Sequence, residues 1–388
     1  MNNIKNTLSR TCRLVKDKPA VLIFIMIFMA AVVWLQRVEK VELYNRTGQT
    51  FEKGIVTEIL QDNVQEDGQR IGEQTVNVRM TTGERKGQVI QMTSSAGYLF
   101  GTACTPGLHI VVVQSISGDS TLSAVYSRDR GNVLFLFAAL YIVVLCLVGG
   151  KQGIRASAGL IFTFVTIIYI YIPLVYLGWS PIGVAILVCA LTTLVTFYII
   201  GGICKKTVVA TCGTVLGVVI AALTAQIFSA ASGITGWNVS NIESLLSIWE
   251  TSEVQVGGLL FAGILISSLG AVMDVAMSIS SSMMELAVQK PEISREELFK
   301  AGMRIGRDMM GTDSNTLILA FAGSEIAVLV LNYAYDLPLL QMINSNNIGI
   351  AIMQGLSGSF GIVLCVPVTV FLASVIYTER QISPMKTI

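Results

Sequence analysis

Residues 259–286 of the chain read LLFAGILISSLGAVMDVAMSISSSMMEL. Small and polar residues recur in this stretch at steps of three or four positions: Gly263, Ser267, Gly270, Asp274, Ser278, Ser281 and Glu285. On an α-helix this spacing places all seven on one face, while leucine, isoleucine, valine, alanine and methionine occupy the other faces. The stretch is long enough to span a bilayer, and a stripe of small residues allows a second helix to approach closely.

The composition of the whole chain agrees with a membrane protein. Of 388 residues, 53% are hydrophobic and 13% are charged, whereas soluble domains carry about 25% charged residues. The net charge of +1 gives no reason to expect a nucleic-acid partner. His109 is the only histidine, and the seven cysteines include no CxxC pair. We therefore expect no enzyme activity, no metal site and no cofactor.

The apolar runs predict a membrane α-helical bundle of about eight transmembrane helices. A small extracytoplasmic β-barrel-like domain is expected between the first and second helices. The helices are expected near residues 20–35, 132–149, 156–176, 181–201, 207–228, 256–286, 313–331 and 348–376. Basic residues precede the first run and no small-x-small cleavage site follows it, which favours an uncleaved signal anchor.

Lysine and arginine are distributed unevenly among the connecting segments. The segments 177–180, 229–255 and 332–347 contain neither residue, and the segments that alternate with them contain several. By the positive-inside rule, both termini are expected in the cytoplasm.

Residues 37–130 have a different pattern from the rest of the chain. Both charge signs occur, and Val76, Val78 and Met80 alternate with Asn77 and Arg79, as in a half-buried strand. Five such runs in about ninety residues favour a closed barrel, because closure removes exposed sheet edges. Four regions follow: a tail and signal anchor (1–36), the β-rich domain (37–130), a seven-helix membrane domain (131–380) and a cytoplasmic tail (381–388).

Asp274 is the residue for which the sequence predicts a function. It lies deep in its apolar run, where an ionised carboxylate costs several kcal/mol unless it meets a partner or a cavity. Either it joins two helices as a structural hydrogen-bonding group, or it handles a proton, ion or substrate. We favour the second interpretation and expect Asp274 to face the other polar spans.

Two further segments carry polar groups at the membrane. The run GRDMMGTDSNT (306–316) supplies hydroxyl, amide and carboxylate oxygens of the kind that hard cations prefer, with Thr312 or Asp313 alternatively capping the start of the seventh span. The eighth span contains glycines, serines and Pro367, which fit either a binding site or close helix packing. The candidate transport core is Asp274, Ser278, Ser281, Gly270, Asp308, Thr312, Asn315 and Ser359.

Two aspartates on successive helices raise the alternative of an intramembrane aspartyl protease. We do not expect one, because the GxGD pattern is absent and because Asp313 is placed at the cytoplasmic edge of its span while Asp274 lies deep.

Three strings carry a family resemblance: residues 257–282, 302–320 (GMRIGRDMMGTDSNTLILA) and 357–369 (SGSFGIVLCVPVT). Over residues 130–376 the chain resembles the YibE/F-like family of bacterial multi-pass membrane proteins, in its longer form with an external β-domain. The resemblance implies a location in the bacterial cell membrane and pairing with a second, shorter YibE/F-like protein. We expect a secondary transporter or permease of unspecified substrate. The alternative is a non-transporting scaffold or assembly component whose β-domain binds an envelope partner.

Overall fold

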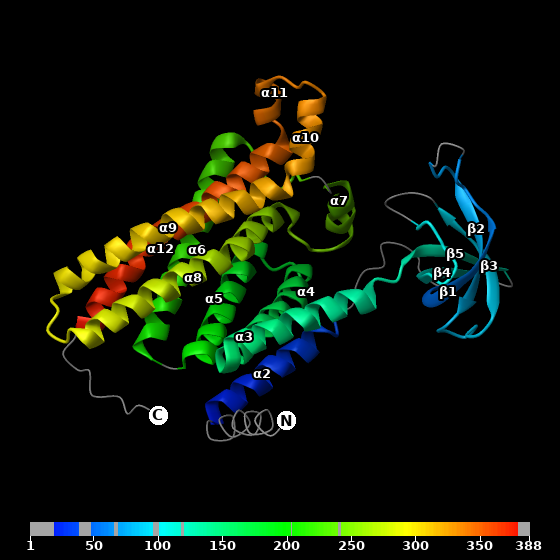
Figure 1. The fold of residues 1–388 in the computed structure, drawn as a ribbon. Helices are drawn as coiled ribbons and strands as arrows, with labels where there is room; N and C mark the ends of the chain where they lie inside the picture. The colour runs from blue at the N-terminus through cyan, green and yellow to red at the C-terminus, as the bar shows by residue number, and fades with distance from the viewer. Residues whose placement is uncertain are drawn as a thin grey trace. The chain divides into compact units, whose positions relative to one another are not determined.

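A computed structural model describes residues 19–38, 48–65, 69–95, 101–117, 120–202, 204–239 and 242–378 (Figure 1). The predicted cytoplasmic tails at both ends lie outside these ranges. The chain divides into two compact units, Glu42–Val148 and the remainder, Met1–Val41 with Gly149–Ile388.

The smaller unit contains the predicted barrel. Its five strands are β1 (Gln49–Gln61), β2 (Glu73–Met80), β3 (Val89–Ser95), β4 (His109–Ser117) and β5 (Ser120–Arg128). They close in the order β1-β2-β3-β5-β4, with β3 and β5 parallel and every other pair antiparallel. The expectation of a five-stranded closed barrel is confirmed, and closure leaves no unpaired edge among these strands.

The barrel interior is mostly apolar. Val76, Val78 and Met80 all point inward, as their alternation predicts. Gln74 is also buried, and its amide donates to the Cys104 carbonyl at 3.2 Å while its oxygen accepts from the Cys104 N–H at 2.7 Å. These bonds hold the segment after β3 against the barrel, because a buried amide is stable only when its polar atoms are paired.

The helix α3 (Gly131–Thr166) begins directly after the barrel and continues through the π-helix η1 (Ile167–Tyr171) into α4 (Ile172–Tyr176). The sequence predicts two helices here, and Gly150 supplies the break with a non-helical backbone at φ 54° and ψ −128°. Glycine adopts a positive φ without the steric penalty of a Cβ. No residue from 131 to 148 is buried, although nearly all are apolar, so this part of α3 presents apolar side chains on every side.

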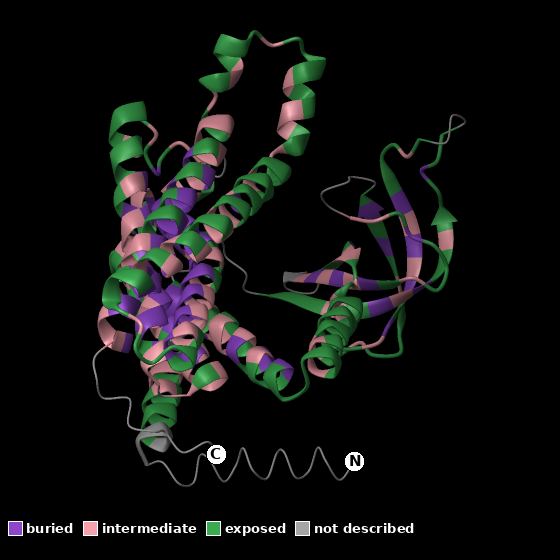
Figure 2. Cartoon of the chain, turned by 60° about the vertical axis from the view of Figure 1, so that its left-hand side comes forward, coloured by how far each residue is buried: buried purple, intermediate pink, exposed green. Residues whose placement is uncertain are grey.

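The larger unit is a helical bundle. Its long helices are α2 (Pro19–Leu35), α5 (Pro181–Gly201), α6 (Lys205–Ser232), α8 (Leu259–Gln289), α9 (Arg295–Ser324) and α12 (Asn346–Thr378). Shorter elements join them: α7 (Ile242–Thr251), η2 (Val256–Gly258), α10 (Ile326–Ala334) and α11 (Leu339–Ile343). Helix α12 packs against α6, α8 and α9, and buried residues gather where these helices meet (Figures 1 and 2).

Five helical segments in the described part of the chain are long and apolar enough to cross a membrane. They are Gly131–Tyr176, α5, α6, Val256–Gln289 and α12. A sixth is added if α9 and α10, which meet at a bend of 56°, form one span. Helix α2 is a shorter apolar helix. Their length and apolar composition are those of membrane-spanning helices.

Candidate functional site: the polar face of helix α8

The small and polar residues of α8 form its outward face. Gly263, Ser267, Gly270 and Asp274 are exposed, and Ser278 and Ser281 are half-buried. A Cβ atom added to Gly263 or Gly270 would meet no atom within 4 Å among its described neighbours. We call this exposed row the α8 polar face. The face is open along Gly263, Ser267 and Gly270, whereas Asp274 lies near Asp313 of the neighbouring helix α9.

The inward face of α8 is apolar and fully packed. Val272, Val275, Ala276 and Ile279 are all 0% exposed within the bundle. The spacing of residue types along a helix identifies its two faces, but it does not show which face packs against the rest of the bundle. In a lipid bilayer, apolar side chains gain nothing from the hydrophobic effect by moving inside the protein. The close packing of branched side chains therefore determines which face of α8 is buried.

The closest helix contacts use glycines other than those of α8. A Cβ on Gly361 of α12 would lie 2.9 Å from the carbonyl oxygen of Gly217 on α6. On α9, a Cβ on Gly302 would meet Met283 and Val370, and one on Gly306 would meet Val366. The pairs Gly213/Gly217 and Gly302/Gly306 are each four residues apart, the GxxxG spacing that favours close helix contact. That signal was present in the sequence and was missed.

Asp274 lies at the centre of α8, fifteen residues from both Leu259 and Gln289. At 1.5 Å per residue, its Cα is about 22 Å from either end of the helix. This is the deepest position that a spanning helix of this length offers. This agrees with the prediction that the carboxyl group lies well inside its apolar run.

Asp313 lies five residues after Asp308, close to the start of the apolar part of its helix. Helix α9 is continuous from Arg295, with the predicted capping box of Ser294 and Glu297 at its start, so Asp313 follows eighteen residues later, about 27 Å along the axis. Its carboxylate is close enough to Asp274 for the two charges to repel each other. That the two aspartates lie at unequal depths therefore stays a prediction from the sequence, which also lacks a GxGD pattern.

The other candidate residues fall into two groups. Asp308, Thr312 and Asn315 are exposed on α9 and recur at steps of four and three, so they share one face of that helix. Ser359 is buried on α12, where its hydroxyl donates to the Gly355 carbonyl at 2.8 Å and also lies 3.4 Å from the Ser314 carbonyl. Ser359 therefore belongs to the packed contact between α9 and α12 rather than to the α8 polar face.

An open groove continues the α8 polar face toward the end of the helix. It measures about 470 Å³ and lies between α8, which supplies Ser281, Ser282, Glu285, Leu286 and Gln289, and Ile305 of α9. In the part of the chain that the structure describes, no cluster of three histidine, cysteine or acidic side chains has the arrangement of a metal site.

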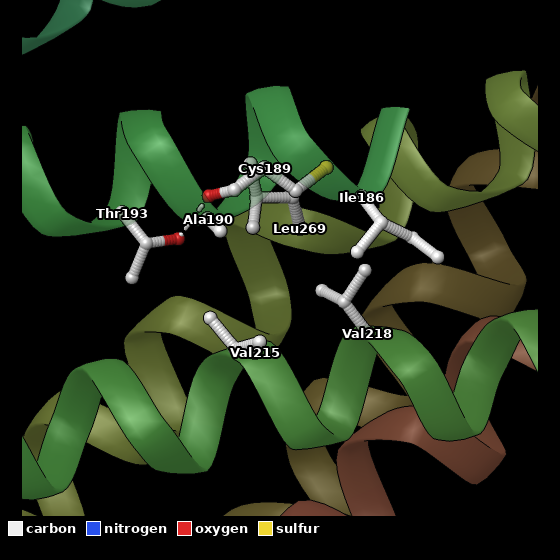
Figure 3. A pocket seen from close by; sticks show the side chains of 7 residues that line it. All are labelled: Ile186, Cys189, Ala190, Thr193, Val215, Val218 and Leu269. Atoms are coloured by element: carbon white, nitrogen blue, oxygen red, sulfur yellow. Dashed lines mark hydrogen bonds between the residues drawn. The ribbon is translucent and has the colours of Figure 1, made fainter. Parts of the chain in front are cut away.

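A hollow between α5, α6 and α8 differs from this groove in size and lining (Figure 3). It holds no volume that a water molecule could occupy, and its walls include Ile186, Val218 and Leu269. The Thr193 hydroxyl beside it donates to the Cys189 carbonyl at 2.7 Å. The Thr193 hydroxyl is thus already hydrogen-bonded within its own helix. The hollow is a packing defect and offers no ligand site.

Comparison with known proteins identifies the family. The family model described as YibE/F-like protein matches residues 137–379, well over half of the chain. No curated protein and no solved structure matches the chain. The matched region begins within α3 and contains every residue of the α8 polar face. The chain therefore belongs to the YibE/F-like protein family.

Proposed function

We propose that this protein is a subunit of a secondary transporter or permease of the bacterial cell membrane, with Asp274 carrying a proton or a cation. The observation that carries the proposal is the carboxyl group of Asp274 at the centre of α8, fifteen residues from either end of that helix, with Asp313 of α9 nearby. An ionised carboxylate at this depth costs on the order of 3 kcal/mol, and a second acid beside it adds repulsion. A bound proton or cation relieves both costs.

Eight spans are consistent with the helices if Gly150 divides the long segment Gly131–Tyr176 into two. Helix α2 then counts as the first span, and α9 with α10 as the seventh. Three of the four tryptophans, Trp179, Trp237 and Trp249, lie in connecting segments that contain no lysine or arginine, whereas Trp34 is followed by Arg37. Tryptophan is enriched at membrane interfaces. This distribution supports an extracytoplasmic barrel and cytoplasmic termini.

A second membrane chain would complete the site. The α8 polar face is open, and an exposed carboxylate in hydrocarbon is unfavourable. Covering the face with another helix leaves a narrow, partly hydrated path along Gly270, Asp274 and Ser278. The shorter YibE/F-like protein implied by the family resemblance is the partner we propose, with the lipid bilayer as the surrounding medium. The role is not enzymatic and needs no cofactor.

Flux measurements test the transport role. The chain is reconstituted into liposomes with its partner subunit, and proton and cation fluxes are compared for wild type, Asp274→Asn and the control Glu285→Gln. Glu285 lies on the same helix face but at the end of the apolar run. We expect Asp274→Asn to lower the flux by about tenfold or more, which corresponds to about 1.4 kcal/mol in the barrier. Equal flux in wild type and Asp274→Asn would remove Asp274 from the mechanism.

The second candidate function is a non-transporting scaffold, and the openness of the α8 polar face favours it. Gly263 and Gly270 leave room for another helix to pack closely. In that case Gly270→Leu abolishes co-purification of the partner, whereas Asp274→Asn has no effect on flux. Crosslinking through a cysteine introduced on the barrel tests for an envelope partner. A monomeric protein that captures nothing excludes the scaffold.

A further inference from the structure

Helix α7 is amphipathic and lies outside the packed core of the bundle (Figure 1). At 100° per residue its large apolar side chains cover one continuous arc of the helix. They are Ile242, Leu245, Leu246, Ile248 and Trp249. The remaining arc carries Glu243, Ser247 and Glu250, all of them exposed. No residue of α7 is buried, so its apolar arc is only partly covered by protein.

The bundle covers one edge of this apolar arc. Ile242, Leu245 and Ile248 pack against the main core. Trp249, by contrast, is 50% exposed and meets the ring of Trp237, which is 40% exposed. The two ring centroids are 5.6 Å apart and the rings stand edge to face, at 82°. We call these two residues the tryptophan pair, which is an exposed aromatic surface beside the bundle.

Glycine contacts place the tryptophan pair at the end of three membrane-spanning segments. A Cβ on Gly257 would lie 3.1 Å from the Trp237 Nε1 atom, and one on Gly258 would lie 3.1 Å from Pro181, the first residue of α5. Gly257 and Gly258 are at the start of the span Val256–Gln289, and α6 ends five residues before Trp237, at Ser232. The common end of three spans marks a surface of the bilayer, so the tryptophan pair lies at that level.

The charges around α7 define what kind of surface it can bind. The segment 229–255 contains three glutamates and neither lysine nor arginine. Attraction to anionic headgroups is therefore absent, and Glu243 and Glu250 keep the polar arc in water. Tryptophan joins a large apolar ring to a single N–H donor, a combination that favours the boundary between headgroups and acyl chains.

We propose that α7 is an interfacial helix, bound to the bilayer surface with the tryptophan pair in the boundary between headgroups and acyl chains. The proposal rests on α5, α6 and α8 crossing the membrane, and neither on transport nor on a partner subunit. Continuity with the lipid-exposed surface of α6 selects lipid as the occupant, because apolar side chains remain exposed close to the end of that helix. Ile227, for example, is 68% exposed and lies five residues before Ser232.

Fluorescence quenching tests the proposal in the full chain. The protein is placed in nanodiscs of phosphatidylcholine, either plain or brominated on the acyl chains near the carbonyl end. One chain keeps Trp249 as its single tryptophan, with the other three replaced by phenylalanine. The control adds Trp249→Phe and Ser247→Trp, which moves the indole to the polar arc of α7. We expect brominated lipid to lower the emission of Trp249 by about twofold or more, and that of the indole at position 247 far less.

Lipid charge and an aqueous quencher complete the test. Quenching of Trp249 by brominated lipid should be the same when phosphatidylglycerol replaces part of the phosphatidylcholine, since no basic side chain lies in this segment. Iodide in the buffer should quench the indole at position 247 more strongly than Trp249. Emission of Trp249 that brominated lipid leaves unchanged would overturn the proposal, as would equal quenching at positions 247 and 249. None of these outcomes depends on whether Asp274 supports flux.

Discussion

Replacing Gly217 with alanine tests the packing of the bundle where it is tightest. A Cβ at this position would lie 2.7 Å from the Val272 Cγ1 atom, 2.9 Å from the Cys365 Cβ and 3.2 Å from the Gly361 carbonyl oxygen. The last two atoms belong to the backbone or are attached directly to it, so α6 and α12 must separate. Overpacking of this kind costs about 1–3 kcal/mol, and the higher helix propensity of alanine returns up to about 1 kcal/mol.

We therefore expect Gly217→Ala to lower the free energy of unfolding by about 1–2 kcal/mol, and Gly217→Val to lower it further. The assay is reversible unfolding of the purified chain in mixed detergent micelles with increasing SDS. Gly270→Ala is the matched control, because its Cβ would meet nothing within 4 Å. In the isolated chain the control should be neutral or slightly stabilising. Equal destabilisation by Gly217→Ala and Gly270→Ala would refute the assignment of inward and outward faces.

Three further predictions concern single interactions. The hydrogen bond from Lys53 lowers the pKa of Asp129 below its ordinary value of 3.8, so the ion pair stabilises the barrel above pH 3.8 and this stabilisation is lost as the pH falls through the lowered pKa. The contribution is less than about 1 kcal/mol, because the Lys53 side chain is half exposed. Acid titration of barrel methyl signals should show this loss in wild type and not in Asp129→Asn. Gln74→Leu leaves the Cys104 N–H and carbonyl unpaired and should destabilise the barrel by about 2–3 kcal/mol, as measured by hydrogen exchange of β2. Tyr377→Phe removes the buried 2.7 Å hydrogen bond to the Ser280 hydroxyl and should cost about 1 kcal/mol in the SDS titration; no change would show that the bond contributes nothing.

The strands and the depth of Asp274 could be predicted because each depends on local pattern. Alternation at Val76, Val78 and Met80 identifies a strand from a few neighbouring residues. The order of strands and the parallel pairing of β3 with β5 depend on contacts between distant residues, which alternation does not encode. The sequence therefore predicted a closed barrel of five strands without its topology.

The direction of the α8 polar face could not be predicted from its spacing. A stripe of glycine and serine suits close packing inside the chain and equally suits packing against another chain. The decision depends on Gly217 and Gly361, which bring α6 and α12 together so closely that branched residues of α8 fill the remaining space.

The central claim is that protein and water, rather than lipid, cover the α8 polar face in the assembled membrane complex. Thiol labelling in liposomes tests it, using a chain whose seven native cysteines are replaced and the partner subunit present. A cysteine at Gly270 should react with a small, membrane-impermeant cationic reagent, whereas cysteines at the buried Val272 and at Leu136, an exposed leucine of α3, should not. A cysteine at Gly270 that is as unreactive as one at Leu136 would show that the face meets hydrocarbon and would contradict the account.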